Sequence, residues 1–213
     1  AEEVGRLLGE GGLTQNRTMK ILGKDFGIHF GVKKLREIAG TIAQMMEDER
    51  QEAQLERLEQ LLKQANKSTG IHKPVIAVGR DGVTLGIRIK YGRLFEVATT
   101  GTVTVFDRQG NRLGTVYLAH VPEPNQPTMN RKLTRLLEEL LVRWKGPLPR
   151  MCYITDAGDN ETSYYKDVLR RMKHPVTGRR LEWIRVLDFY HASIRVWEMA
   201  ELFFGKGMRG TSW

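Results

Sequence analysis

The chain has 213 residues, 40% of them hydrophobic, and carries a formal net charge of +9. This length allows one domain or a domain with an appendage, and the apolar content is enough for a packed core. One cysteine excludes an internal disulfide, and no signal peptide or membrane-length apolar run is visible, so we expect a cytoplasmic protein without a membrane partner.

The positive charge is unevenly distributed along the chain. Residues 1–70 contain 11 basic and 11 acidic side chains, whereas residues 71–213 contain 23 basic and 14 acidic ones. Lys and Arg side chains replace the counterions condensed on nucleic-acid phosphates. The excess over 71–213 therefore predicts double-stranded DNA as a partner, with a basic soluble protein as the alternative.

The first 70 residues carry helical patterns. The spacing predicts a short helix over 18–26, a turn over 27–31 and a long helix from Val32 onward. Apolar residues recur at helical spacing along that long helix, at Leu35, Ile38, Ile42, Met45, Leu55, Leu58 and Leu62.

Charge is polarised along this helical region. Six basic residues fall between 17 and 36, and seven acidic residues fall between 37 and 59. This pattern favours a helix-turn-helix that binds DNA through Lys33, Lys34 and Arg36. A dimerisation element, a helical hairpin packed on the next domain or a short coiled coil are the alternatives.

Residues 66–70 form the clearest linker, and Pro74 prevents the helix from continuing. Beyond it we expect strands at 75–81, 93–106, 113–121, 152–155 and 183–187, and helices at 128–144, 162–172 and 189–204. Right-handed crossovers place the fourth strand parallel to the first and the fifth outside it. The predicted fold class is α/β, a ribonuclease H-like mixed sheet flanked by helices over 71–213, after an all-helical region over 1–70.

Two aspartates mark the predicted catalytic site. Asp81 and Asp156 each end an apolar strand, precede a Gly or Ala, and are separated by 74 residues. Ligands bind at the carboxyl ends of strands in such sheets, so both carboxylates are expected at the same rim. Their oxygens suit Mg²⁺ or Mn²⁺ in a two-ion site for phosphoryl transfer. A turn role for Asp81 and a helix cap for Asp156 are the structural alternatives.

Asp188 and His191 form a second candidate group. Asp188 occupies the position of a helix N-cap, where a carboxylate accepts backbone N–H groups. His191 then falls in the first turn, where the helix dipole favours a neutral imidazole.

Three segments, "AVGRDGV", "YITDAGDNETSYY" and "VLDFYHASIRVWEMAELFFG", resemble the transposases of the Kra-type bacterial insertion sequences, which are related to the Mutator-like group. The resemblance covers roughly residues 71–205. It implies a DDE (Asp-Asp-Glu) catalytic domain in which Asp81 is the first acid and Asp156 the second. Asp188 and His191 match the family's D-x-x-H signature.

The sequence differs from this family's pattern at the third catalytic acid. The resemblance implies a glutamate downstream of a helical insertion after D-x-x-H, but Trp213 is only 22 residues beyond His191. We therefore expect a chain truncated at its C-terminus, with Glu198 and Glu201 as weaker candidates for the third acid. In a truncated chain, Trp197, Phe203 and Phe204 would have large exposed areas, and the 205–213 tail would lack a packing partner.

The sequence thus favours part of an insertion-sequence transposase that hydrolyses a phosphodiester at an element end and joins the freed 3′-hydroxyl to target DNA. Self-association in a transposition complex is expected with it. The alternatives are a ribonuclease H-like nuclease without strand transfer and a non-catalytic DNA-binding remnant.

Overall fold

The computed structural model describes residues 2–9 and 13–205. Its internal contacts divide the chain into two units, Ala1–Gln54 and Leu55–Trp213. The division falls inside helix α4 (Glu47–Lys67), whose second half packs into the core of the second unit. It therefore differs from the 70/71 boundary that the linker predicts, and the domains over 1–70 and 71–213 stay a prediction.

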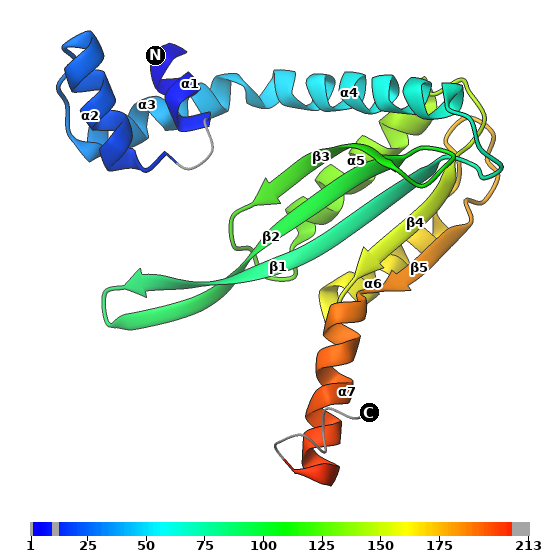
Figure 1. Cartoon of the computed structure of the whole chain (residues 1–213). Helices are drawn as coiled ribbons and strands as arrows, with labels where there is room; N and C mark the ends of the chain where they lie inside the picture. Colours follow the sequence, from blue (N-terminus) through cyan, green and yellow to red (C-terminus); the bar gives the residue numbers. More distant parts are fainter. Residues whose placement is uncertain (1, 10–12, 206–213) are drawn as a thin grey trace. The chain divides into compact units, whose positions relative to one another are not determined.

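The first unit contains three helices, α1 (Glu2–Gly9), α2 (Gln15–Phe26) and α3 (Val32–Met45), and the beginning of α4 (Figure 1). Its core is built from Val4, Leu7, Leu22 and Leu35. Thr14 caps α2 by accepting the backbone N–H of Arg17 at 3.3 Å. Gly27 ends the helix with φ of 65°, a left-handed conformation that glycine adopts without a Cβ clash.

The long helix predicted from Val32 is two helices. Met46 ends α3, and α4 begins at Glu47. No glycine or proline lies between residues 41 and 69, so the sequence carries no breaker signal at this junction, and the interruption was not predicted. Leu55, Leu58 and Leu62, the residues on which the coiled-coil alternative depends, are buried in the core of the second unit.

The second unit is built on one five-stranded sheet with the order β3-β2-β1-β4-β5. Its strands are β1 (Val75–Ile89), β2 (Gly92–Phe106), β3 (Arg112–His120), β4 (Arg150–Thr155) and β5 (Trp183–Leu187). The first three strands are antiparallel, and β4 and β5 run parallel to β1. This mixed sheet has the ribonuclease H-like topology, so the predicted fold class is confirmed.

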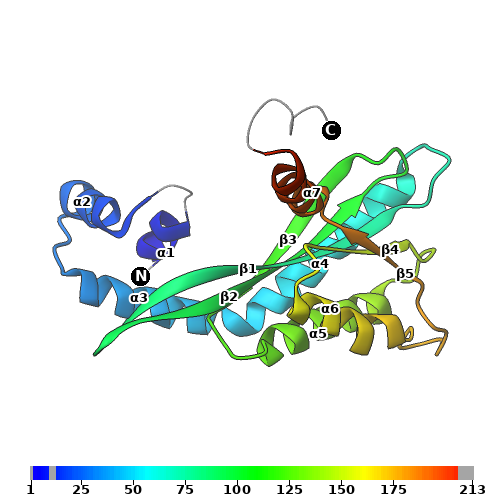
Figure 2. The ribbon, with the colours of Figure 1, turned by 90° about the horizontal axis from the view of Figure 1, so that it is seen from below.

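The second half of α4 and two further helices, α5 (Pro127–Arg143) and α6 (Asp159–Asp167), cover one face of the sheet, and a short 3₁₀ helix, η1 (Leu169–Arg171), follows α6 (Figure 2). Side chains alternate between the two faces of a strand, so Ile76 and Val78 of β1 meet the apolar side of α5. Leu133, Leu136, Leu137, Leu140 and Leu141 of α5 are all buried in this core.

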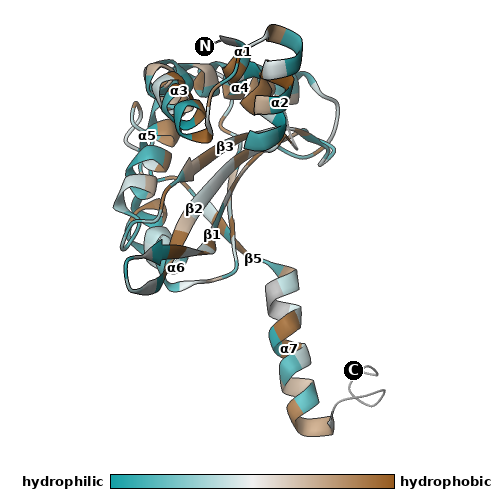
Figure 3. Ribbon diagram, turned by 90° about the vertical axis from the view of Figure 1, so that its left-hand side faces the viewer, coloured by the Kyte–Doolittle hydropathy of each residue, from teal (hydrophilic) through white to brown (hydrophobic). Residues whose placement is uncertain are grey.

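Apolar side chains are exposed on the opposite face and on helix α7 (Phe189–Phe204), along which Figure 3 shows several hydrophobic positions. Ile154 and Val186 of the open sheet face are 38% and 40% exposed. Trp197, Phe203 and Phe204 are 44%, 75% and 47% exposed, as the sequence predicts. The expectation for the 205–213 tail is not tested, because residues 206–213 lie outside the described part of the chain.

Several element boundaries differ from the sequence prediction, among them the end of the helix predicted over 162–172, which is at Asp167; two further differences lie beside the aspartates. β1 continues eight residues past Asp81, because the alternating β-branched residues after Gly82 pair with β2 instead of turning. α6 begins at Asp159, three residues earlier than expected, so Asp159 lies in its first turn and not in a loop.

No helix among residues 2–9 and 13–205 has both the length and the apolar character needed to cross a membrane.

Candidate active site

The register of the parallel strands aligns three aspartates. Gly79 of β1 is level with Ile154 of β4, and two residues further along each strand are Asp81 and Asp156. Thr155 of β4 is level with Leu187 of β5, so the next residues are Asp156 and Asp188. Neighbouring strands are about 4.8 Å apart. Asp81, Asp156 and Asp188 therefore form a row across the sheet, where β4 and β5 end beside the middle of the longer strand β1.

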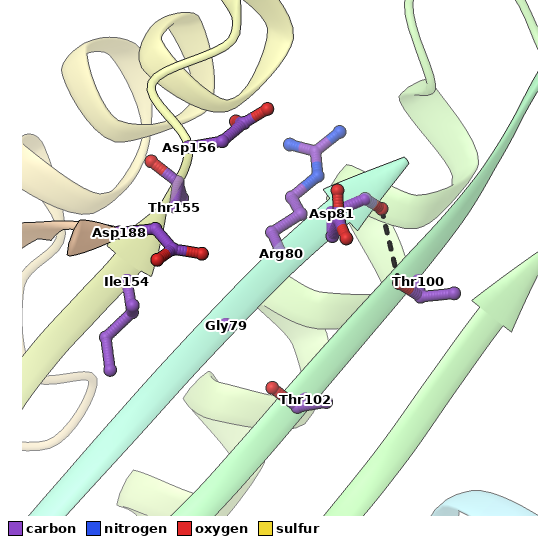
Figure 4. A pocket seen from close by; sticks show the side chains of 9 residues that line it. All are labelled: Gly79, Arg80, Asp81, Thr100, Thr102, Ile154, Thr155, Asp156 and Asp188. Carbon is purple, nitrogen blue, oxygen red and sulfur yellow. Dashed lines mark hydrogen bonds between the residues drawn. The ribbon is translucent and has the colours of Figure 1, made fainter. Parts of the chain in front are cut away.

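This row lines one pocket of about 180 Å³ (Figure 4). Thr100 and Thr102 of β2 contribute hydroxyl groups to the pocket wall. Gly79 is needed here because a Cβ at this position would lie 2.5 Å from Oγ1 of Thr102. The structure thus brings Asp81 and Asp156 to the same rim of the sheet and adds Asp188 to them.

The turn after β4 holds Asp156 in a defined backbone conformation. The next residue, Ala157, has φ of 71°, a left-handed value that costs roughly 1–2 kcal/mol for a residue with a Cβ. Three hydrogen bonds hold the turn: Ala157 N–H to Thr155 Oγ1 at 3.2 Å, Gly158 N–H to Asp156 Oδ1 at 2.9 Å, and Thr162 Oγ1–H to the Ala157 carbonyl at 3.2 Å. Strain of this kind occurs preferentially at functional sites.

The other two aspartates also accept local backbone donors. Oδ1 of Asp81 accepts the N–H of Gly82 at 2.7 Å, and Oδ1 of Asp188 accepts the N–H of Tyr190 at 2.8 Å. Asp188 is therefore the N-cap of α7, as its position in the sequence indicates. Its own backbone N–H donates to the Thr155 carbonyl at 2.8 Å, which fixes the end of β5 against the end of β4.

A buried arginine lies beneath this acidic row. Arg80 is 3% exposed, and its Nη2 donates a hydrogen bond to Gln126. Its Nε lies 3.9 Å from Oε1 of Glu161, and its guanidinium carbon lies 5.1 Å from the ring centre of Tyr164. Its Nε and Nη1 have no hydrogen-bond partner among the described residues. A fixed positive charge in this position reduces the repulsion between the carboxylates that line the same pocket.

Sequence reasoning missed Arg80 and Glu161. A signal for Arg80 was present, because alternation along β1 places it on the same face as the core residues Ile76 and Val78. Glu161 had no comparable signal, since its burial depends on how α6 packs on the sheet.

Two tyrosines complete the packing below the pocket. Burial raises the pKa of Tyr164 to about 12, and burial also raises the pKa of Tyr153 well above its usual range. The Tyr153 hydroxyl donates to the Glu161 carbonyl at 3.2 Å, and the hydroxyls of Tyr164 and Thr134 are 2.9 Å apart. Both rings are therefore neutral, packed supports of the site at ordinary pH.

The structure does not bring the candidate third acids to the pocket. Glu198 pairs with Arg195 at 3.0 Å on an exposed face of α7, and Glu201 accepts a hydrogen bond from Trp197 Nε1 at 3.2 Å. They follow Asp188 by 10 and 13 residues, which is about 15–20 Å along a helix. His191 lies in the first turn of α7, but its side chain is outside the described part of the chain.

The predicted DNA-binding residues of the first unit lie at the start of α3. Lys33, Lys34 and Arg36 are all exposed. Lys34 Nζ lies 3.3 Å from Glu37 Oε2, and Arg36 Nε donates to Gln15 Oε1 at 3.3 Å. These positions are in the first turns of the second helix of a helix-turn-helix pair, where base-contacting residues occur in that motif. Their role stays a prediction.

The donor set fits a divalent ion of the Mg²⁺ type that is held partly by the protein. Asp81 and Asp156 supply hard carboxylate oxygens at one rim, and Mg²⁺ is often held by one or two carboxylates together with water and substrate phosphate. The described residues contain no group of three or more His, Cys, Asp or Glu side chains placed to enclose an ion. The arrangement therefore fits an ion completed by substrate and not a closed protein cage.

No protein-family model matches the chain, and no curated protein matches it. Among solved structures, the chain is similar to LC9-RNase H1, described as a type 1 RNase H with the type 2 active-site motif. The identity is 17%, the match covers 59% of this chain and 72% of that chain, and the TM-score is 0.28. It is also similar to a chain of the Mos1 strand transfer complex, with 14% identity, coverage of 86% of this chain and 56% of that chain, and a TM-score of 0.27.

Proposed function

We propose that this chain carries the catalytic domain of a DDE-type insertion-sequence transposase, which cleaves a DNA phosphodiester and transfers the freed strand. The observation that carries the proposal is the row of Asp81, Asp156 and Asp188 across three adjacent parallel strands, at the level where β4 and β5 end. The resemblance of the three sequence segments around these residues to one transposase family supports the narrower assignment. Ribonuclease H-like folds serve nucleases as well as transposases.

Each residue has a defined part in this proposal. Asp81 and Asp156 hold Mg²⁺ or Mn²⁺, which when bound supplies Lewis-acid activation of the attacking oxygen and stabilises the leaving oxygen. Arg80 offsets the negative charge of the row from below, and Asp188 ties the ends of β4 and β5 together. Double-stranded DNA is the proposed substrate because the basic excess of the chain lies in residues 71–213. Self-association in a transposition complex belongs to the same proposal.

The test is cleavage and joining by the full chain. A supercoiled plasmid carrying the DNA that flanks the gene is incubated with Mg²⁺ or Mn²⁺, and the nicks and joined products are mapped. We expect Asp81→Asn and Asp156→Asn to reduce cleavage at least 1,000-fold, or about 4 kcal/mol in the barrier, while DNA binding changes less than about threefold. Asp167→Asn is the matched control, because Asp167 is an exposed aspartate at the end of α6 and outside the pocket. Undiminished metal-dependent cleavage in either aspartate variant contradicts the proposal.

A non-catalytic DNA-binding protein is the second candidate. It is favoured by the absence of a group of three metal-holding side chains among the described residues and by the backbone hydrogen bonds that each aspartate accepts. In the same assay it predicts salt-sensitive DNA binding without cleavage in any variant. Cleavage that depends on both aspartates but yields no joined product assigns the chain to the nucleases instead.

A further inference from the structure

The hairpin of β1 and β2 extends beyond the rest of the sheet (Figure 1). β4 pairs only with residues 75–79 of β1, and β3 pairs only with residues 99–106 of β2. Residues 82–98 therefore form a two-stranded ribbon, which we call the ribbon, in which each strand is paired only with the other. Asp81 lies at its base, opposite Thr100.

One face of the ribbon is apolar and exposed. Val83, Leu85, Ile87 and Leu94 share the face of Asp81, since directly paired residues and alternate residues lie on the same side. Their exposed fractions run from 37% to 49%. A two-stranded ribbon is marginally stable in water unless it packs against something else. The ribbon is therefore a surface that gains stability when a partner covers it.

The tip of the ribbon is basic. Arg88 and Arg93 are directly opposite each other in the register and both are exposed, and Lys90 lies in the turn between the strands. Like charges opposite each other destabilise a strand pair. No ion pair or hydrogen bond from the Arg88 or Arg93 side chain to a described residue offsets this repulsion. Arg88 and Arg93 lie on the face of the ribbon opposite Val83, Leu85 and Ile87, and the one acidic residue of the ribbon, Glu96, pairs with Leu85 on that more apolar face.

The ribbon has the size to engage a duplex that is bound at the aspartate row. Arg88 is seven residues beyond Asp81 on the same strand, which is about 23 Å. Along B-DNA that distance is about two-thirds of a helical turn, or roughly seven base pairs. A two-stranded ribbon also fits the width of the major groove.

We propose that the ribbon is a DNA-binding arm whose arginine pair contacts backbone phosphates about seven base pairs from the bond held at the aspartate row. This proposal rests on the proposed function, because it takes duplex DNA as the ligand of the same site. Phosphates relieve the repulsion between Arg88 and Arg93, and the duplex covers the ribbon. A second copy of the chain is a poorer occupant, because a two-fold contact between tips sets four arginines against one another.

The first experiment measures affinity of the full chain for a 40-base-pair duplex by fluorescence anisotropy over a range of salt. Replacing both arginines (Arg88→Gln with Arg93→Gln) should weaken binding about tenfold or more at low salt. The salt slope should fall by about 1.8, because each phosphate that an arginine no longer neutralises removes about 0.9. The melting temperature of this variant should stay unchanged or rise, since a repulsion is removed. Unchanged affinity and slope overturn the proposal.

The matched control removes the same charge elsewhere. Arg170 and Arg179 are exposed and lie before β5, at the rim of the sheet opposite the aspartates. Arg170→Gln with Arg179→Gln should change affinity less than about twofold and leave the salt slope unchanged. Equal losses of affinity in the two double variants would mean that only the net charge of the chain matters, and they would overturn the proposal that the ribbon is a DNA-binding arm.

A second experiment locates the tip on DNA. An iron chelate is attached to Lys90→Cys in a Cys152→Ser background, and the positions where it cleaves the duplex are mapped. We expect a maximum about seven base pairs from the nick that the unmodified chain makes. A maximum at the nick itself, or cleavage spread evenly, contradicts the proposed placement.

The outcomes distinguish the proposed DNA-binding arm from the proposed catalytic function. If DNA binding depends on Arg88 and Arg93 but no cleavage occurs, the ribbon is still a DNA-binding arm and the catalytic proposal is rejected. If cleavage depends on the aspartates, and the Arg88 and Arg93 variant changes neither cleavage nor DNA binding, the catalytic proposal stands and the DNA-binding arm is rejected. If the arginine variant instead lowers self-association in sedimentation while a single chain binds DNA as before, the ribbon is a protein contact and the arm is rejected.

Discussion

The two ends of the β1–β2 hairpin have the same strand pairing but different surroundings. At the base, Val78 and Val103 are level with each other and fully buried between β3, β4 and the helices. Beyond Gly82, Ile87 and Leu94 are also level with each other, but 37% and 45% of their surfaces are exposed. Backbone pairing alone therefore does not fix a strand in the fold; packing on a second layer does. The base can hold Asp81 rigidly, whereas the ribbon is available to a partner.

The largest expected effect is a difference in the free energy of unfolding between two isoleucine variants of the same strand, β1. Ile76→Ala removes a side chain that is 1% exposed in the core, and we expect it to lower the free energy of unfolding by about 2–5 kcal/mol. Ile87→Ala removes the same atoms from the ribbon, and we expect a decrease below about 1 kcal/mol. Urea unfolding of the two variants measures the difference. Equal decreases would show that the ribbon packs as tightly as the base.

The buried charge pair at the base gives a smaller expected effect. Glu161→Gln leaves the buried Arg80 guanidinium without its acid, and we expect the free energy of unfolding to fall by roughly 2–4 kcal/mol. The control is Glu139→Gln, which breaks the exposed Arg135–Glu139 pair of 2.7 Å and should cost less than about 1 kcal/mol. A decrease no larger for Glu161→Gln than for Glu139→Gln would mean that the charge beneath the aspartates is not structurally important.

The smallest expected effect is a pH dependence of the free energy of unfolding, which reports on the burial of Tyr164. The pKa of Tyr164 is raised from 10.0 to about 12 in the folded chain, so the folded state keeps a proton that the unfolded state loses. Stability from this group is complete below about pH 10 and decreases as pH rises toward 12. In Tyr164→Phe the alkaline decrease should be shallower by up to about 1.4 kcal/mol per pH unit. A slope identical to that of the unmodified chain contradicts the burial argument.

The sequence predicted the parts of the fold that depend on local pattern. The five strands and the helices over 128–144 and 189–204 follow from periodicity, and the shared rim of Asp81 and Asp156 follows from the right-handed crossover rule. The helix that starts at Asp159 was placed three residues too late, because Asp159 and Asn160 look like loop residues until the turn at Ala157 is known.

The finer features of the site depend on register and on tertiary packing. The alignment of Asp188 with the other two aspartates requires the pairing of Thr155 with Leu187, which a single sequence does not specify. The ribbon was missed because Asp81-Gly82 resembles a turn, whereas Gly82 pairs with Thr99 and the strand continues. The burial of Arg80 against Tyr164 depends on where α6 packs, which local pattern cannot determine.

The most direct test of the central claim measures metal binding without catalysis. Mn²⁺ is titrated into the full chain at neutral pH and followed by electron paramagnetic resonance or calorimetry. We predict a site at the rim of the sheet whose affinity falls at least tenfold in Asp81→Asn and in Asp156→Asn, while Asp167→Asn binds as the unmodified chain does. Mn²⁺ binding that is the same in all four proteins, or absent from all of them both without DNA and with duplex DNA present, would contradict the assignment of the two aspartates to a divalent-ion site.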